Sequence, residues 1–345
     1  MKKTRFQEIT SHYGQLRIGV IGDFSLDRYL EIDPSKSEIS IETGLPVHNV
    51  INVRSQPGAA GTILNNLVAL GVKTASPVGF CGKDGEGYEL QQALRAQGKS
   101  VPIDHFLPTD QRRTFTYCKP LLLRPGKPPE ELNRLDTKNW TPTPPVVEER
   151  LIDSTLKLAR DADALIVLDQ VDLAETGVIT RRLLNTLSEL TETRPDLLIL
   201  GDSRRGVGDW PNLTFKMNVN ELAAMTGNPR PLAPAEVGAM AVEVARGTRR
   251  SVFITMAEKG MLAATPAGEV ERIASLPLRG NIDVVGAGDS VTANLTVALA
   301  AGATLREALQ IASAAASLVI HQLGTTGVAT VEQMEELLFG SMLLA

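Results

Sequence analysis

Short apolar runs alternate along most of the chain with stretches in which apolar residues recur at helical spacing. The apolar runs predict buried strands, and they cover residues 16–23, 73–82, 162–169, 196–202 and 251–260. Helical patterns cover residues 62–71 and 85–98 and a C-terminal stretch from about 289 to 322. Continuous apolar strands separated by helices are typical of a parallel sheet covered on both faces. We therefore predict an α/β fold whose main body has a parallel sheet between two layers of helices.

Two segments, residues 24–54 and 112–124, interrupt this rhythm. Their partly alternating pattern of apolar and polar residues predicts additional strands. We expect both insertions to form a small β-rich sheet that projects from the body as a lid, closes over a site and excludes water. An ordinary extension of the sheet edge is the alternative.

Composition narrows the function classes. The chain has 345 residues, 43% of them hydrophobic and 22% charged, as in ordinary globular proteins. The formal net charge of −5 argues against a nucleic-acid surface, because phosphates favour a basic face. Cys81 and Cys118 lack metal-ligand spacing, and no histidine belongs to an HExxH motif. The polar N-terminus and the lack of an apolar run of ~20 residues predict a cytoplasmic protein with no membrane partner.

Near the C-terminus, the stretch DVVGAGDS at Asp283–Ser290 directly precedes an apolar helical pattern. A helix N-terminus attracts anions, because its first N–H groups are unpaired and carry partial positive charge. Gly286 and Gly288 would let this backbone approach a phosphate without interference from a Cβ atom. A dinucleotide-binding fingerprint would need a small residue at Val291, and the chain contains no Walker A motif.

Asp289 lies within this glycine stretch, where its charge would repel a phosphate that is merely bound. A carboxylate is useful there if a ligand hydroxyl lies between it and the phosphate. It can then accept the hydroxyl proton while backbone N–H groups stabilise the transferred phosphoryl group. The alternative is a glycine turn in which Asp289 and Ser290 only cap a helix. The stretch therefore indicates either phosphoryl transfer to an alcohol or a simple cap.

Several linked motifs, from about residue 16 to 335, resemble the ribokinase/PfkB family of carbohydrate kinases. The family hallmark, aspartate-threonine-valine-glycine-alanine-glycine-aspartate, matches Asp283–Asp289 except at Val284. The other matching stretches, in chain order, are GDFSLDRY at 22–29, PGAAGTILNNLVALG at 57–71, NVNE at 218–221 and ITMAEKG at 254–260.

The resemblance implies roles for individual residues. The implied base is Asp289, and the implied anion hole is the backbone of Gly286, Ala287 and Gly288. The acceptor sugar would contact Asp27, Gly58 and Thr62. The implied nucleotide side is formed by Asn218, Glu221, Thr255 and Gly260, with Glu221 linked to the metal through water. The implied cofactors are ATP and Mg²⁺, with a monovalent cation near residue 283 as a further expectation.

Within the family, the layout is similar to that of the heptose-7-phosphate kinases that feed lipopolysaccharide heptose synthesis. The stretches SEISIETGLPV, RTFTYCKPLLL and NRLD, which begin at residues 37, 113 and 133, carry this likeness. Lys119 and Arg134 then become candidate cationic contacts to an acceptor that already has a phosphate; solvated charges at the lid edge are the alternative. The chain would contain the kinase part only, without the nucleotidyltransferase domain of bifunctional relatives.

The chain also departs from the family pattern. Thr62 replaces an asparagine that reaches the sugar, and Ala59 and Ala257 replace glycines. In the subgroup, residues 168–172 would be a serine-aspartate-tyrosine stretch followed by lysine, and here they are LDQVD. A threonine is shorter than asparagine and lacks its paired donor and acceptor, so these changes favour a different hydroxyl pattern or a different sugar.

We predict a single kinase-like unit over residues 1–345, with a ribokinase-like three-layer body at 16–23 and 55–335 and a lid at 24–54 and 112–124. The predicted function is ATP-dependent phosphorylation of a hydroxyl on a sugar or sugar phosphate. The alternative is a catalytically weak kinase-like protein that binds nucleotide or sugar; a dinucleotide oxidoreductase is disfavoured by the missing third glycine. Because a lid of two β insertions often pairs with its copy, we expect a homodimer through the lid.

Overall fold

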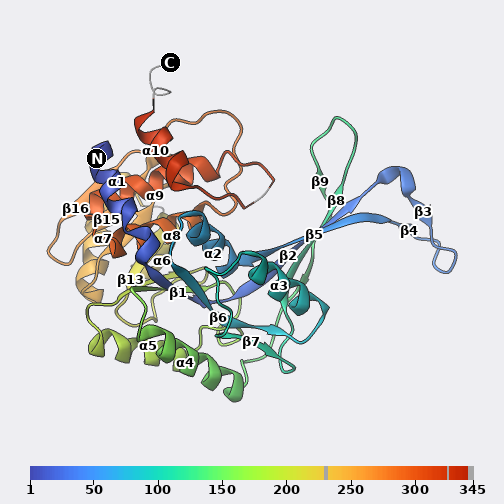
Figure 1. The fold of residues 1–345 in the computed structure, drawn as a ribbon, viewed down its shortest axis with the longest axis horizontal. Coiled ribbons are helices and arrows are strands. Elements are labelled where there is room, and N and C mark those ends of the chain that lie inside the picture. Colours follow the sequence, from blue (N-terminus) through green and yellow to red (C-terminus); the bar gives the residue numbers. More distant parts are fainter. Residues whose placement is uncertain (229–231, 325, 341–345) are drawn as a thin grey trace.

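A central sheet organises the molecule (Figure 1). The computed structural model describes residues 1–228, 232–324 and 326–340. Within these ranges nine strands form one sheet. In order across the sheet they are β16 (Val270–Ile273), β15 (Met261–Ala264), β14 (Val252–Thr255), β13 (Thr214–Asn218), β12 (Leu198–Ser203), β11 (Ala164–Asp169), β1 (Arg17–Gly22), β6 (Thr74–Gly82) and β7 (Phe106–Thr109).

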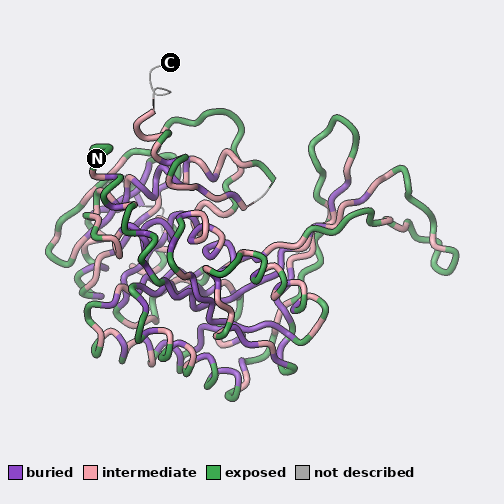
Figure 2. The backbone as a smooth tube through the Cα atoms, in the orientation of Figure 1, coloured by how far each residue is buried: buried purple, intermediate pink, exposed green. Residues whose placement is uncertain are grey.

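Helices cover both faces of this sheet, as the continuous apolar strands predict. One face packs against α1 (Lys3–Ser11), α2 (Ala60–Ala69), α3 (Gly85–Ala96), α8 (Ala287–Ala300), α9 (Leu305–Val319) and α10 (Val331–Phe339). The other packs against α4 (Pro145–Ala159), α5 (Arg181–Thr193), α6 (Val219–Met225) and α7 (Pro234–Thr248). On β11, Ile166 and Leu168 enter the first core while Leu165 and Val167 enter the second. The predicted three-layer α/β fold is confirmed, and Figure 2 shows its buried centre.

A second sheet extends away from the body (Figure 1). Its central strand β2 (Phe24–Ile32) pairs antiparallel with β5 (Val50–Ala59) and parallel with β8 (Phe115–Leu122). The short strands β9 (Glu130–Glu131) and β10 (Leu135–Thr137) both pair with β8. A hairpin of β3 (Glu38–Ile39) and β4 (Pro46–Val47) lies at the far end. Both predicted insertions therefore contribute to this sheet, which continues beyond their expected ends to Ala59 and Thr137.

The structure differs from the sequence prediction at several element ends. The sheet is not wholly parallel, because β15 and β16 return as antiparallel strands after a tight turn at Ala257–Lys259. The predicted helical stretch 289–322 is two helices, α8 and α9, separated by a turn that contains Gly302. The body also includes α1, whose Phe6 and Ile9 are buried in the first core.

Candidate active site

The glycine stretch lies at the start of α8, as its position before an apolar helical pattern predicts. Gly286 adopts a left-handed conformation, with φ of 81°, directly before the first helical residue. Asp283 holds the preceding loop, because its carboxylate accepts the N–H groups of Val285 at 3.0 Å and Gly324 at 3.3 Å. The loop is therefore tied both to itself and to the segment after α9.

One predicted member of the anion hole has a hydrogen-bond partner within the protein. The Ala287 N–H donates to the Val284 carbonyl at 3.2 Å, so this donor is used inside the turn. Gly288 and Asp289 lie in the first turn of α8, where an N–H has no carbonyl four residues earlier within the helix. The helix N-terminus can thus present donors to an anion, but Ala287 does not supply one of them.

Asp289 is a partly buried carboxylate in this first turn. Burial raises its pKa to about 7, and the nearby charges of Asp202 and Asp27 add to the increase, while Lys216 opposes it. A carboxylate with a pKa near neutrality can release and accept a proton under physiological conditions. Because the charge of Asp27 acts on Asp289, the predicted base and the predicted acceptor residue lie near each other.

A buried ion pair lies beside Asp289. Asp202, at the end of β12, accepts hydrogen bonds from Lys216 Nζ at 2.8 Å and from Thr292 Oγ1 at 2.9 Å. Burial lowers the pKa of Lys216, but the charges of Asp202, Glu221 and Asp289 outweigh it, so the net shift is upward. A Cβ atom at Gly288 would lie only 3.3 Å from Lys216 Nζ. A permanent positive charge therefore faces the glycine backbone.

Asn218 and Glu221 form the N-terminal cap of α6. Asn218 Oδ1 accepts the N–H groups of Asn220 and Glu221, and Glu221 Oε2 accepts the Asn218 N–H at 2.7 Å. Burial raises the pKa of Glu221, although the Asn218 N–H and Lys216 act against this. The predicted motif thus has a structural role. The charges of Lys216 and Asp202 also act on the Glu221 carboxylate, so the three residues lie near one another.

The two other predicted nucleotide residues, Thr255 and Gly260, flank the turn between β14 and β15. Thr255 pairs with Asn218 across the sheet, so both lie at the same edge. Gly260 has φ of 89°, and a Cβ atom there would lie 2.1 Å from the Ile273 carbonyl oxygen. The backbone turn by itself requires glycine at this position.

The predicted acceptor residues Asp27 and Gly58 are neighbours across β2 and β5. A Cβ atom at Gly58 would lie 2.3 Å from Asp27 Oδ1 and 2.6 Å from Ser25 Oγ, so only glycine fits. Lys119, on β8, pairs with the buried Asp27 carboxylate at 3.0 Å. Thr62 is buried in the first turn of α2, four residues after Gly58.

The second sheet also reaches the glycine loop directly. Gln56, on β5, donates to Thr326 Oγ1 at 3.0 Å, and Thr326 is the nearest contact for a Cβ atom built on Gly286. Arg134, by contrast, is half-exposed; it pairs with Asp136 at 2.6 Å and stacks over the Tyr117 ring at 4.9 Å. Lys119 and Arg134 therefore both have carboxylate partners within the protein.

A profile of pfkB family carbohydrate kinases matches residues 213–331, the part of the chain that carries Lys216, the Asn218–Glu221 cap and Asp289. The wider sequence relatives span nearly the whole chain. Bifunctional protein HldE of Nitrobacter hamburgensis is 29% identical over 348 residues, which cover 99% of this chain and 67% of that protein. Residues 213–331 thus match the pfkB family of carbohydrate kinases, within a chain that is similar to HldE over nearly all of its length.

Other relatives agree with this similarity. Bifunctional protein HldE of Hyphomonas neptunium is 30% identical over 92% of this chain and 62% of its own length. The chain spans about two thirds of the length of these relatives. The resemblance found in the sequence, and the enzyme class that it implied, a carbohydrate kinase, are confirmed.

Solved pfkB-type structures share the fold. Arabidopsis thaliana ribokinase, complexed with ribose and ATP, has a TM-score of 0.68 at 17% identity and covers 94% of this chain and 99% of its own. Phosphofructokinase-2 from Escherichia coli, in complex with potassium, has a TM-score of 0.71 at 16% identity, covering 93% of this chain and 97% of its own. At these identities the likeness shows the ribokinase-like fold.

Two departures from the pfkB pattern keep the backbone of the glycines that they replace. Ala59, the residue before α2, has φ of 53°, and Ala257 has φ of 50°. Positive φ strains any residue that has a Cβ atom. Both alanines therefore hold a backbone conformation that glycine adopts freely, at a cost in backbone strain.

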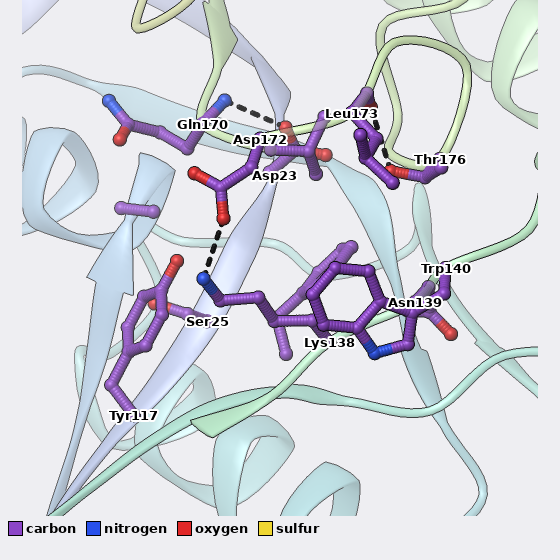
Figure 3. A pocket seen from close by; sticks show the side chains of 13 residues that line it. Asp23, Ser25, Tyr117, Lys138, Asn139, Trp140, Gln170, Asp172, Leu173 and Thr176 are labelled. Atoms are coloured by element: carbon purple, nitrogen blue, oxygen red, sulfur yellow. Dashed lines mark hydrogen bonds and ion pairs between the residues drawn. The ribbon is translucent and has the colours of Figure 1, made fainter. Parts of the chain in front are cut away.

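A narrow pocket lies between the second sheet and the loop after β11 (Figure 3). It is lined by Asp23, Ser25, Ala59, Phe115, Tyr117, Lys138, Asn139, Trp140, Gln170, Val171, Asp172, Leu173 and Thr176. Asp23 anchors its wall, because its carboxylate accepts the N–H groups of Gln170 at 2.8 Å and Val178 at 2.7 Å. Burial and the nearby Asp169 raise the pKa of Asp23 to about 7.

Sequence reasoning missed several polar residues of this pfkB site. Asp202 and Lys216 were absent from the predicted set, although each is a charged residue in an otherwise apolar strand, which is a usable signal. Lys138 and Trp140 come from a proline-rich connection that has no periodic pattern, so no local signal marked them. Of the predicted residues, Asp27 and Asp289 lie close enough to interact, and Lys119 and Gly58 contact Asp27.

The site fits the phosphates of ATP, because a helix N-terminus and the Lys216 ammonium face the same glycine backbone. No group of three or more His, Cys, Asp or Glu side chains in the described ranges could hold a metal ion. A Mg²⁺ ion would therefore take most ligands from water and phosphate, as this ion commonly does. None of the helices described is long and apolar enough to cross a bilayer.

Proposed function

We propose that this protein transfers the γ-phosphoryl group of ATP to a hydroxyl of a sugar or sugar phosphate, with Asp289 as the general base. One observation carries the proposal: a carboxylate whose pKa is raised to about 7 lies in the first turn of a helix whose start faces a buried lysine. Base, anion donors and positive charge are the three elements that phosphoryl transfer to an alcohol requires.

Asp289 accepts the proton of the acceptor hydroxyl. The hydroxyl oxygen forms a bond to the γ-phosphorus, the bond from that phosphorus to the bridging oxygen breaks, and ADP leaves with the bonding electron pair. The first-turn N–H groups of α8 and the Lys216 ammonium stabilise the negative charge on the transferred group. Asp202 and Thr292 fix the position of Lys216 through their shared hydrogen-bond network.

On the acceptor side, Asp27 accepts hydrogen bonds from sugar hydroxyls, with Gly58 leaving room for its carboxylate and Thr62 completing the wall. Lys119 orients Asp27 through their 3.0 Å ion pair. The second sheet acts as the lid, and the Gln56–Thr326 hydrogen bond couples its position to the glycine loop. A closed lid keeps water from taking the phosphoryl group.

When bound, Mg²⁺ would supply positive charge to the phosphate oxygens of ATP, and Asn218 and Glu221 would hold it through water. Thr255 and Gly260 line the nucleotide. A monovalent cation near residue 283 is part of the proposal, since phosphofructokinase-2 from Escherichia coli was crystallised with potassium. Rates that are equal in potassium and in tetramethylammonium buffers would remove the cation from the mechanism.

The hairpin arm supports a homodimer through the lid. Ile39, Ile41 and Leu45 are 62%, 98% and 65% exposed, and Val50, Ile51 and Val53 extend this apolar surface along β5. So many exposed apolar side chains on one projecting arm favour an interface. Light scattering would reject the dimer if the protein has the mass of one chain at micromolar concentration. The cytoplasmic location stays a prediction.

The decisive experiment incubates the protein with ATP-Mg²⁺ and a panel of sugars and sugar phosphates, with ADP measured against a sugar-free control and products identified by mass. Asp289→Asn is the matched variant, because an asparagine side chain keeps the shape of aspartate but cannot act as the base. We expect its kcat to fall by roughly 10²–10⁴, with nucleotide affinity nearly unchanged.

Equal turnover by wild type and Asp289→Asn would overturn the assignment of the base. An inert panel despite measurable ATP binding would instead favour the alternative function, a catalytically weak protein that binds nucleotide or sugar. Thr62 is the departure that motivates this alternative, since the backbone at Ala59 and Ala257 keeps the glycine conformation.

A further inference from the structure

Gln56 lies where the second sheet joins the body (Figure 1). Along β5, the residues from Val50 to Arg54 are exposed, whereas Pro57 and Gly58 are buried. Gln56 is also paired in register with Asp27, the predicted acceptor residue on β2. Residues directly opposite each other on antiparallel strands share a face of the sheet, so the Gln56 side chain lies on the same face as the acceptor carboxylate.

The amide nitrogen of Gln56 bridges two hydroxyl groups. Nε2 donates to Thr326 Oγ1 at 3.0 Å and to Tyr29 Oη at 3.4 Å. An amide nitrogen has two hydrogen atoms, so each of these bonds uses one of them. Tyr29 Oη also accepts a hydrogen bond from Lys119 Nζ at 3.4 Å, and this ammonium pairs with Asp27 at 3.0 Å. A continuous chain of polar contacts therefore runs from Asp27 to Thr326.

Thr326 belongs to the segment after α9, which packs against the glycine loop. A Cβ atom built on Gly286 would lie 3.4 Å from Thr326 Cβ. The Asp283 carboxylate ties this segment to the loop. Gln322 holds its other side, because it donates to the Val328 carbonyl at 2.7 Å and accepts the N–H of the same residue at 3.2 Å. A displacement of the glycine loop should therefore reach Gln56 through Thr326.

The opposite face of the second sheet has a different attachment. Ser55 Oγ donates to Glu89 Oε2 at 2.7 Å, and Arg28 pairs with the same carboxylate at 2.9 Å. Glu89 lies on α3. In the part of the chain that the structure describes, these three side chains form no hydrogen bond or ion pair with the glycine loop or with Thr326. Successive residues of β5 thus attach the sheet to two different parts of the body.

We infer that Gln56 is a positioning residue that couples nucleotide binding to acceptor binding, an inference that rests on the proposed kinase function. A nucleotide phosphate at the glycine loop fixes Thr326, which in turn fixes the Gln56 amide. Through Tyr29, this amide holds Lys119 and Asp27 in place. Less conformational entropy is then lost when the acceptor binds, so its affinity rises. Because such coupling is reciprocal, a bound acceptor also tightens the nucleotide.

Hydrogen–deuterium exchange tests the transmission with a nucleotide alone. Exchange is followed with and without Mg²⁺ and a non-hydrolysable ATP analogue. In wild type we expect the analogue to slow amide exchange by about threefold or more in the glycine loop and also in β2 and β5. Gln56→Met removes both N–H groups and keeps the length of the side chain. In this variant the slowing should remain in the loop and disappear from the two strands.

The matched control is Ser55→Ala, which removes the neighbouring attachment on the opposite face of β5. It should keep the wild-type response in the loop and in both strands. Thr326→Val removes the hydroxyl that accepts the Gln56 N–H and should behave like Gln56→Met, whereas Thr326→Ser keeps the hydroxyl and should keep the response. The double variant of Gln56→Met and Thr326→Val should lose no more than either single variant, because both remove the same bond.

Calorimetry measures the size of the coupling. The Kd of the ATP analogue is determined without and with the sugar that reacts best in the panel of acceptors. In wild type we expect the sugar to lower this Kd by roughly fivefold or more. In Gln56→Met the two values should be equal, and the Kd without sugar should stay within about twofold of wild type, because the glycine loop itself is unchanged.

An analogue that protects the glycine loop of wild type but not β2 and β5 overturns the inference and leaves the kinase proposal standing. Equal protection of these strands in wild type and Gln56→Met also overturns it, as does an equal loss of protection in Ser55→Ala. Protection that depends on Gln56, without ADP formation from any sugar, refutes the kinase proposal and supports the coupling. An analogue that does not bind refutes both.

Discussion

Two carboxylates, Asp289 and Asp23, both have a pKa raised to about 7, yet they are placed for different tasks. Asp23 accepts two backbone N–H groups, from Gln170 and Val178. Asp289 accepts no hydrogen bond from the described part of the chain, and its surroundings act on it through burial and charge. The first carboxylate is committed to holding a wall, and the second is available to a ligand.

The difference teaches that a raised pKa by itself does not identify a catalytic base. Burial raises both values, but only Asp289 lies beside donors and a cation that can hold a phosphoryl group. Asp23 resembles a buried structural carboxylate, and its loss should disturb the acceptor pocket more than the chemistry. The following measurements test this difference between the two carboxylates.

Kinetics should separate the two carboxylates most strongly. We expect Asp289→Asn to lower kcat by roughly 10²–10⁴, because the base is lost, and Asp23→Asn to change kcat by less than about tenfold while raising KM for the acceptor. Initial rates of ADP formation at saturating ATP-Mg²⁺ and variable acceptor give both constants. Similar losses of kcat in both variants would contradict the division of tasks.

Lys216→Met tests whether the charge beside Asp289 is part of the same unit. The substitution leaves Asp202 buried without its cation, so we expect a loss of about 3–5 kcal/mol in the free energy of unfolding. The double variant with Asp202→Asn should recover part of that loss without recovering activity. Denaturant titration measures the stabilities, with Lys157→Met, at an exposed position on α4, as the control. Full activity in a folded Lys216→Met variant would remove Lys216 from the mechanism.

The stability of the two variants should follow pH in the same way but differ by the hydrogen bond that only Asp23→Asn loses. Because folding raises both pKa values from 3.8, the folded state holds protons that the unfolded state has released, and this stabilisation is present below about pH 4 and lost as pH rises through about 7. Asp289→Asn should therefore be more stable than wild type by about 2 kcal/mol at pH 5 and by about 4 kcal/mol at pH 8.

Asp23→Asn should lie about 1–2 kcal/mol below Asp289→Asn at both pH values, because an amide can accept only one of the two N–H groups. Thermal unfolding at the two pH values measures both effects. In the same pH range, wild-type kcat/KM should rise as pH passes through about 7 and Asp289 loses its proton. A flat profile would count against Asp289 as the base.

The smallest effect concerns backbone strain on the two sides of the site. Ala59→Gly, beside the acceptor pocket, and Ala257→Gly, in the predicted nucleotide segment, should each raise the free energy of unfolding by about 1 kcal/mol, because both alanines have positive φ. Ala93→Gly, in the middle of α3, should lower it by about the same amount. A loss of stability in either test variant would show that its site does not store strain.

The amino-acid sequence determined much of this protein by itself. Continuous apolar strands and periodic helices specified a covered parallel sheet, because these patterns are local and the hydrophobic effect acts on them directly. The glycine stretch before Asp289 and the Asn218–Glu221 cap were equally readable, since a helix start depends on residues three or four positions apart. The ends of the second sheet and the turn between α8 and α9 were harder to predict, because strand pairing and short turns override the local hydrophobic pattern.

Only the tertiary structure decided which charges meet. Lys216 and Thr292 reach Asp202 from 14 and 90 positions away, and Lys119 reaches Asp27 from 92. These pairs depend on strand order and register, which the sequence encodes through the whole core and not through any motif. The same packing gives Asp23 its backbone donors and leaves Asp289 open to a ligand, because burial and long-range neighbours, and not the residue type, set the task of a carboxylate.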